Sequence, residues 1–205
     1  KNIRILTADG GNPLKTWFME RDLKYWMKDV QFGKILNRIF AEIPVFGTVV
    51  LKIVDGEPEF VDLRNFIVEQ STDCLDDANY IIEKHPYTVT SFREVAKQMG
   101  WDKSKVKETI DLYHQMKDVK HIMVYERYGE VEDEKGNWDY RRVYLADVGI
   151  NEEDEQNKRS IPYKGVLLSS EVIDPEDIPY WEFHLEKIPG RWLGVGVVET
   201  LFEPQ

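Results

Sequence analysis

The sequence is poor in cysteine. Its 205 residues contain one, Cys74, so no intramolecular disulfide can form. Because disulfides persist in oxidising compartments, a single thiol favours a reducing compartment such as a bacterial cytoplasm. Cys74 could act as a nucleophile, but a lone cysteine is more often a small buried apolar residue.

Long apolar runs are also missing. No stretch approaches the ~18 consecutive apolar residues that cross a bilayer, and no apolar leader precedes a small-residue cleavage site. We therefore expect a soluble chain with no membrane partner. Lys1 and Gln205 both look like cut ends, so we expect an internal piece of a longer polypeptide. Apolar residues still make up 42% of the chain, which excludes a disordered chain and suffices for a core.

An excess of positive charge is absent. The chain has 27 Lys and Arg against 38 Asp and Glu, a formal charge of −11. A protein that holds nucleic acid tightly needs clustered Lys and Arg to contact the phosphates. The composition therefore argues against tight nucleic-acid binding, but not against a protein past which DNA slides.

Spacings typical of metal sites are missing as well. The four histidines lack a pattern such as H-x-x-x-H; they are His85, His114, His121 and His184. Asp73, Asp76 and Asp77 could surround Mg²⁺, but they lack regular calcium-loop spacing, and Asp-rich turns usually cap helices. We predict no metal ligand, no cofactor-binding residue and no catalytic residue.

The first 44 residues predict two helices. Asn12 is placed as an N-cap and Pro13 at the first helical position. Apolar residues recur at helical spacing from about Leu14 to Met27. The pattern resumes in a second helical piece that reaches Phe40 and ends at Pro44.

The period then changes to that of strands. Val45 to Val54 is apolar and β-branched, and Asp55-Gly56 is a strong hairpin signal before a returning strand at Glu59 to Leu63. Asn79 to His85 predicts a further strand. We expect the two helices to pack beside this small antiparallel sheet.

Two short helices should follow. Ser91 with Glu94 has capping-box spacing, and Gly100 is placed to end that helix. Asp102 or Ser104 would cap the next one.

A long hairpin comes after these helices. Its strands would be His121 to Tyr128 and Trp138 to Val148, joined by the acidic segment Gly129 to Asn137, and Gly165 to Val172 predicts another strand. The predicted class is α+β. Residues 1–88 would form helices with an antiparallel hairpin, residues 89–187 a small α/β region, and residues 188–205 a turn and a helix start.

Aromatic and arginine side chains gather in the long hairpin. Tyr, Trp and Arg are enriched at protein interfaces, although an ordinary solvated hairpin explains them equally well. The candidate contact residues are Tyr125, Arg127, Trp138, Tyr140 and Arg142.

A glycine-rich segment near the C-terminal end organises the rest of the chain. It combines a Pro-Gly turn, an Arg-Trp pair, a Gly-x-Gly and an acidic residue; its members are Pro189, Gly190, Arg191, Trp192, Gly194, Gly196 and Glu199. Gly194 and Gly196 mark backbone that approaches something closely or takes unusual dihedrals. A phosphate-binding loop is a poor alternative, because the third glycine is missing and Glu199 would repel phosphate. Val197 and the apolar residues after it would open a helix.

This segment, with the aromatic run Pro179 to His184 before it, resembles the part of tailed-bacteriophage portal proteins that precedes their next long helix. The related portals are those of short-tailed phages. The helices up to Phe40 and the hairpin from Val45 are similar to the portal wing, and the hairpin around Gly136 would lie in the clip.

The resemblance implies a structural protein without enzymatic activity. Portal subunits form a ring, typically a dodecamer, at one vertex of the capsid, and are made in the host bacterial cytoplasm. The large terminase subunit drives double-stranded DNA through the ring, and tail adaptors bind later. The alternatives are a phage or mobile-element adaptor that holds a protein partner through the Trp138 hairpin, and an enzyme with a Cys74 or carboxylate site.

Overall fold

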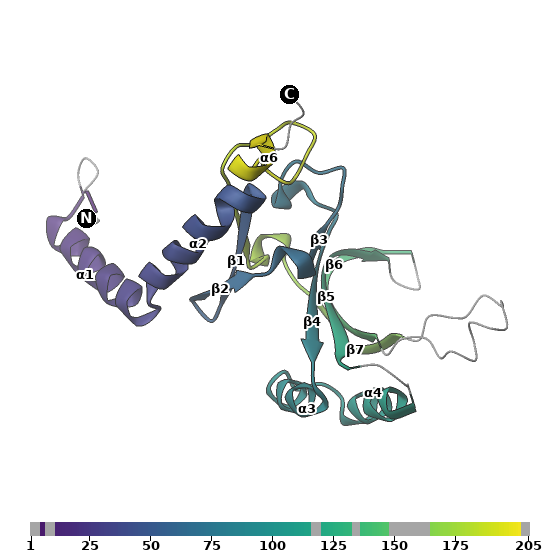
Figure 1. Ribbon diagram of the computed structural model, residues 1–205. Helices are drawn as coiled ribbons and strands as arrows, with labels where there is room; N and C mark the ends of the chain where they lie inside the picture. Colours follow the sequence, from purple (N-terminus) through teal and green to yellow (C-terminus); the bar gives the residue numbers. More distant parts are fainter. Residues whose placement is uncertain (1–4, 7–10, 116–119, 133–135, 148–164, 202–205) are drawn as a thin grey trace. The chain divides into compact units, whose positions relative to one another are not determined.

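The computed structural model describes residues 5–6, 11–115, 120–132, 136–147 and 165–201 (Figure 1). It confirms the α+β class. The chain divides into two compact units. Unit 1 comprises Lys1–Phe60, Tyr180–Ile188 and Leu193–Gln205, and unit 2 comprises Val61–Pro179 and Pro189–Trp192.

The boundaries of these units differ from the three segments expected from the sequence, 1–88, 89–187 and 188–205. Strands before residue 88 belong to the sheet of unit 2, and a strand at 180–184 returns to the sheet of unit 1. Both differences arise from pairings between strands that are far apart in the sequence.

Unit 1 begins with two helices, α1 (Pro13–Asp29) and α2 (Phe32–Phe46). The side chain of Asn12 accepts a hydrogen bond from the Leu14 amide at 3.0 Å, which confirms the predicted N-cap. The second helix does not end at Pro44, as predicted, but continues to Phe46 and stops at Gly47, whose φ is 70°.

These helices bury none of their residues. The helices nevertheless lie beside the sheet, as expected. The second helix contacts the strand Thr48–Val54, the Trp26 indole donates to the Gly56 carbonyl at 3.0 Å, and the Arg38 guanidinium lies 3.8 Å from the Phe60 ring centroid. Large side chains remain exposed on both helices, among them Leu14, Trp17, Phe18, Met19, Tyr25, Phe40 and Phe46.

The sheet of unit 1 has the strand order β2-β1-β8. The predicted hairpin is confirmed as β1 (Thr48–Val54) and β2 (Glu57–Val61), with β1 starting three residues later than Val45 because the preceding residues are still helical. The third strand, β8 (Tyr180–His184), was not predicted and runs antiparallel to β1. The strand predicted at Asn79 to His85 belongs to the other sheet.

Unit 2 contains a five-stranded antiparallel sheet in sequence order. Its strands are β3 (Phe66–Val68), β4 (Tyr80–Tyr87), β5 (Ile122–Glu132), β6 (Trp138–Asp147) and β7 (Gly165–Val172). The long hairpin is thereby confirmed, but β5 extends to Glu132, so the first residues assigned to its turn are strand. Residues 133–135 of the turn and the polar segment 151–158 lie outside the described residues.

Two helices cover one face of this sheet near one end, α3 (Val89–Gln98) and α4 (Lys103–Gln115) (Figure 1). The N-cap of α3 is Thr88, not Ser91, because the Thr88 hydroxyl accepts from the Ser91 amide at 3.2 Å. Asp102 caps α4 by accepting from the Ser104 amide at 2.7 Å. The core between helices and sheet consists of Phe92, Ala96, Trp101, Ile110, Ile122, Val124, Tyr144, Ala146, Val166 and Leu168.

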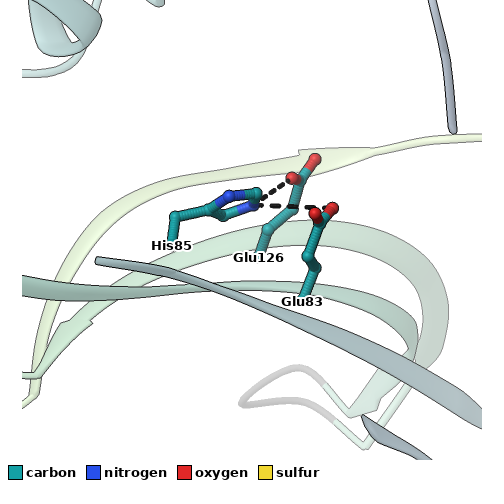
Figure 2. A group of neighbouring side chains, drawn as sticks. All are labelled: Glu83, His85 and Glu126. Carbon is teal, nitrogen blue, oxygen red and sulfur yellow. Dashed lines mark hydrogen bonds and ion pairs between the residues drawn. The ribbon is translucent and has the colours of Figure 1, made fainter. Parts of the chain in front are cut away.

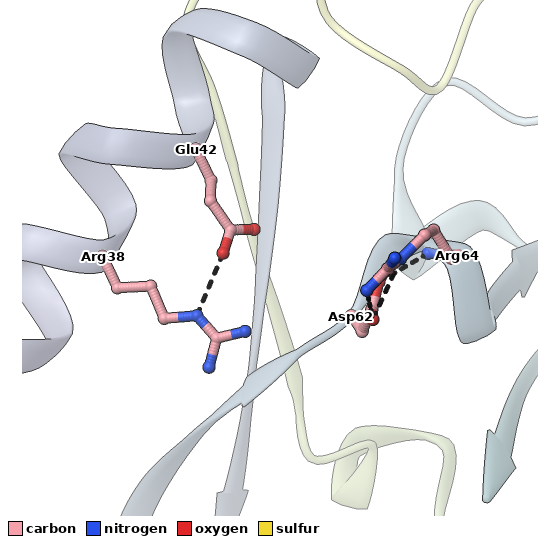
Figure 3. A network of polar contacts seen from close by, with 4 residues as sticks. All are labelled: Arg38, Glu42, Asp62 and Arg64. Atoms are coloured by element: carbon pink, nitrogen blue, oxygen red, sulfur yellow. Dashed lines mark hydrogen bonds and ion pairs between the residues drawn. The ribbon is translucent and has the colours of Figure 1, made fainter. Parts of the chain in front are cut away.

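Short helical turns complete the described chain: η1 (Leu63–Asn65), η2 (Leu75–Asp77), η3 (Pro175–Asp177) and α6 (Val197–Leu201). Figure 3 shows two local ion pairs, Arg38 with Glu42 one turn later on α2, and Arg64 with Asp62, the N-cap of η1. In the described ranges, none of the helices is long and apolar enough to cross a membrane.

Candidate functional site

The turn of the glycine-rich segment is held by unit 2. Gly190 has a φ of 78°, a value that glycine adopts without strain. Its amide donates to the Asp73 carboxylate at 2.7 Å, and the ring of Trp192 lies 5.7 Å from that of Phe66. Pro189 is exposed and Arg191 half-buried. The Pro-Gly turn and the indole therefore anchor this part of the segment.

The Gly-x-Gly part packs within unit 1. A Cβ on Gly194 would lie 2.5 Å from the Gly47 carbonyl oxygen, and one on Gly196 2.6 Å from the Val45 carbonyl oxygen. Real Cβ atoms do not approach backbone so closely. Two explanations were expected for these glycines, a close backbone approach or unusual dihedrals, and the structure shows the first. This packing accounts for them without a phosphate ligand.

A buried hydroxyl group fixes the same place. Thr48 is fully buried; its Oγ1 accepts from the Gly194 amide at 2.6 Å and lies 3.0 Å from His184 Nδ1. The hydroxyl proton is thus available to His184, so one side chain joins the start of β1, the end of β8 and the glycine segment. Glu199 lies exposed in the first turn of α6, the predicted helix start.

A second group of polar side chains lies on the sheet of unit 2. Glu83 and His85 are two residues apart on β4 and share a face, and Glu126 on β5 is directly opposite Glu83 (Figure 2). His85 Nε2 is 3.0 Å from Glu126 Oε2 and 3.6 Å from Glu83 Oε2. The other oxygen of Glu126 accepts from the hydroxyls of Tyr128 at 2.7 Å and Tyr144 at 2.8 Å. These five residues are called the Glu126 cluster.

The buried carboxylate of Glu126 dominates the electrostatics of the Glu126 cluster. The Glu126 side chain is only 3% exposed, so its carboxylate depends on these three partners in place of water. Burial, reinforced by the negative charge of Glu126, raises the pKa of Tyr128 and of Tyr144. Both tyrosines therefore stay protonated and act as hydrogen-bond donors.

The same cluster offers the donor types of a divalent metal site. One atom each from Glu83, His85 and Glu126 lies within 4.8 Å of the others, and imidazole with carboxylates suits zinc, iron or manganese. In the geometry described, His85 Nε2 faces both carboxylates, so a cation bound here would lie between that nitrogen and the carboxylate oxygens. The contacts of Glu126 with His85, Tyr128 and Tyr144 already account for the burial of its carboxylate.

Sequence reasoning did not find this cluster. The Glu-x-His spacing on a strand was the available signal, since residues two apart share a face. Glu126 lies 41 residues after His85, and only the register of β4 on β5 brings it near.

The acidic loop proposed as a magnesium alternative is arranged differently. Asp73 accepts from the Gly190 amide, and the Cys74 thiol donates to Asp77 at 3.0 Å. Among the described residues, the groups with metal-binding geometry do not include Asp73, Asp76 and Asp77.

The candidate contact residues of the long hairpin do not form one exposed patch. Trp138 is strongly exposed, at 63%. Tyr125 on β5 lies on the opposite face of the sheet from Trp138, and its hydroxyl lies 3.4 Å from the Asp147 carboxylate. Arg127 is half-buried and donates to the Glu130 carbonyl at 2.9 Å.

Tyr140 and Arg142 share the face of Trp138, since each lies two residues from the last along β6. Arg142 is paired with Glu171 of β7 at 2.6 Å, and burial raises the pKa of Tyr140. Trp138 is therefore the one member of the five that projects strongly into solvent.

A scan against models of known protein families and a search of curated proteins both find no match to this sequence.

Proposed function

We propose that this chain is part of a portal subunit of a tailed bacteriophage, a structural protein of the capsid vertex. The proposal rests on the resemblance of residues 189–199, and on one structural observation. Helices α1 and α2 bury none of their own residues, yet they carry large apolar side chains that a folded monomer rarely leaves in contact with water. A neighbouring subunit of a ring would cover such a surface.

Other features agree with this role. The formal charge of −11 would repel phosphate and let double-stranded DNA slide, whereas tight binding would stall its passage. The proposed partners are identical subunits in a ring of twelve, the large terminase subunit and tail adaptors. No catalysis is assigned to the chain, and its proposed location is the virion.

The test is the mass in solution of the full-length protein, by native mass spectrometry and light scattering, with negative-stain images. We expect rings with a central hole. A monomer at high protein concentration would overturn the proposal.

Two matched variants make the test sharper. Trp17→Glu with Phe18→Glu places charge on the exposed face of α1, where these side chains are 55% and 47% exposed, and should prevent ring formation. Val172→Glu alters a similarly exposed apolar residue at the end of β7 in unit 2, 59% exposed, and should leave rings intact. If the first variant still forms rings, the face of α1 is not the contact between subunits.

The second candidate is an adaptor that binds a different protein through the hairpin. The exposure of Trp138 is the observation that favours it. An adaptor predicts the opposite outcome: no rings of the full-length protein, and loss of a heterologous partner in Trp138→Glu.

A further inference from the structure

Helices α3 and α4 enclose a groove of about 560 Å³ in unit 2. This volume lies in the range of about 300–1,000 Å³ that is typical of ligand sites. The groove has an apolar floor and a charged rim. We call it the basic groove; its lining residues are Arg93, Ala96, Lys97, Gly100, Trp101, Lys103, Val106, Lys107, Ile110 and Asp111.

The rim of the basic groove carries four cations, Arg93, Lys97, Lys103 and Lys107, against one carboxylate, Asp111. All four cations are exposed. Among the described residues, no ion pair ties any of them to a carboxylate. Their charge is therefore available to a ligand.

This positive rim contrasts with the rest of the chain. Residues 89–115 contain five Lys and Arg and four Asp and Glu, a net charge of +1, whereas the whole chain carries −11. A groove with this local charge attracts anions that the remaining surface repels. The ligand should therefore be acidic and short enough to contact the groove alone.

The floor adds a second requirement. Trp101, Val106 and Ile110 present carbon atoms, and the Trp101 ring is fixed against Phe92 and Tyr144 at centroid distances of 5.8 and 5.3 Å. A ring held in this way, 6% exposed, offers an apolar surface but no free face for stacking a nucleic-acid base. A large aliphatic or aromatic side chain fits the floor better.

We propose that the basic groove binds a short acidic peptide segment of a partner protein. One large apolar side chain of the peptide rests on Trp101, Val106 and Ile110, and flanking carboxylates pair with the lysines and arginine of the rim. This site is independent of the proposed ring, since it uses only α3 and α4.

The experiment is a titration of the chain into a fluorescein-labelled peptide in which six glutamates surround one leucine and one phenylalanine, followed by fluorescence anisotropy. Saturable binding that weakens with added salt is expected, because exposed ion pairs are screened. A peptide with glutamine in place of glutamate, and one with alanine in place of the two apolar residues, should each bind more weakly. Equal binding of either control would overturn the proposal.

Variants of the chain locate the site. Lys97→Glu with Lys107→Glu should weaken binding by about tenfold, since two exposed ion pairs are lost and each contributes a factor of a few to the affinity. The matched control is Lys15→Glu with Lys34→Glu, which makes the same change of charge at exposed positions of α1 and α2 and should bind as the unaltered chain does. Circular dichroism of both variants checks that they are folded.

Two further outcomes would count against the proposal. Backbone amide shifts of the ¹⁵N-labelled chain should change on α3 and α4 and at the Trp101 indole; changes confined to other residues would overturn it. A single-stranded oligonucleotide that binds the groove as tightly as the peptide would assign it to nucleic acid instead.

Discussion

Gly194 can pack directly against the backbone because it has a hydrogen atom where other residues have a side chain. Its amide donates to Thr48, and its α-carbon faces the Gly47 carbonyl. The sequence indicated that this backbone either approaches something closely or takes unusual dihedrals, because both are uses of glycine. It could not indicate the partner, which lies 147 residues earlier in the chain.

We predict that Gly194→Ala lowers the free energy of unfolding by about 2 kcal/mol or more, because the new methyl group would meet backbone atoms that cannot move aside. Gly33→Ala is the matched control. No atom lies within 4 Å of the Cβ added there, and alanine favours a helix over glycine by up to about 1 kcal/mol. Urea unfolding measures both. Equal losses in the two variants would contradict the close packing.

The Glu126 cluster predicts a dependence of stability on alkaline pH. Burial and the Glu126 charge raise the pKa of Tyr128 and Tyr144 in the folded chain, whereas in the unfolded chain tyrosine ionises near pH 10. Below about pH 10 both tyrosines are protonated in the folded and in the unfolded chain, so they do not make stability depend on pH. Above it the unfolded state loses protons first, so stability falls, by up to about 1.4 kcal/mol per tyrosine and pH unit.

Urea unfolding between pH 8 and about pH 12 measures this slope. Tyr128→Phe and Tyr144→Phe should each make it shallower, while Tyr25→Phe, at a 60% exposed position, should not. A slope that both buried substitutions leave unchanged would show that other groups cause the alkaline transition.

At the scale of elements, local signals predicted most helices and strands. The N-cap at Asn12, the turn at Asp55-Gly56 and the alternation from Trp138 onward are all confirmed. Two strands were missed for different reasons. β3 has three residues, too few for a period. The residues of β8 were noted only as an aromatic run before the glycine-rich segment, because their partner strand β1 is remote in the sequence.

The N-cap of α3 is Thr88 in the structure, whereas the sequence had indicated Ser91. Thr88→Ala should lower stability by about 1 kcal/mol, because Thr88 is the N-cap whose hydroxyl accepts from the Ser91 amide. Ser91→Ala removes a hydroxyl inside the first turn and should cost less than half as much. Thermal unfolding followed by circular dichroism compares the two, and the reverse order would restore Ser91 as the cap.

At the scale of the whole molecule, the two units differ in how far apart in the sequence their packed segments lie. The core beneath the helices of unit 2 is formed by residues from Phe92 to Leu168, whereas the sheet of unit 1 needs both β1 and β8. No composition or periodicity reveals this difference, since it depends on pairing across more than 100 residues. The two-unit division was therefore beyond the sequence, although the α+β class was not.

We predict that residues 61–179 alone fold and unfold cooperatively on heating, and that residues 1–60 alone do not form their sheet. Circular dichroism and one-dimensional NMR of the two fragments test this. A cooperative transition of residues 1–60 would show that β8 is dispensable for unit 1.

The pairing of β1 with β8 also has a consequence for the order of events on the ribosome. The 126 positions from Val54 to Tyr180 take roughly 6–25 s to translate at about 5–20 residues per second. During that interval unit 2 can fold, while β1 waits with an unpaired edge beside helices that carry exposed aromatic residues. Nascent chains are thus open to premature association at this stage, and slower translation should increase the fraction that aggregates or recruits a chaperone.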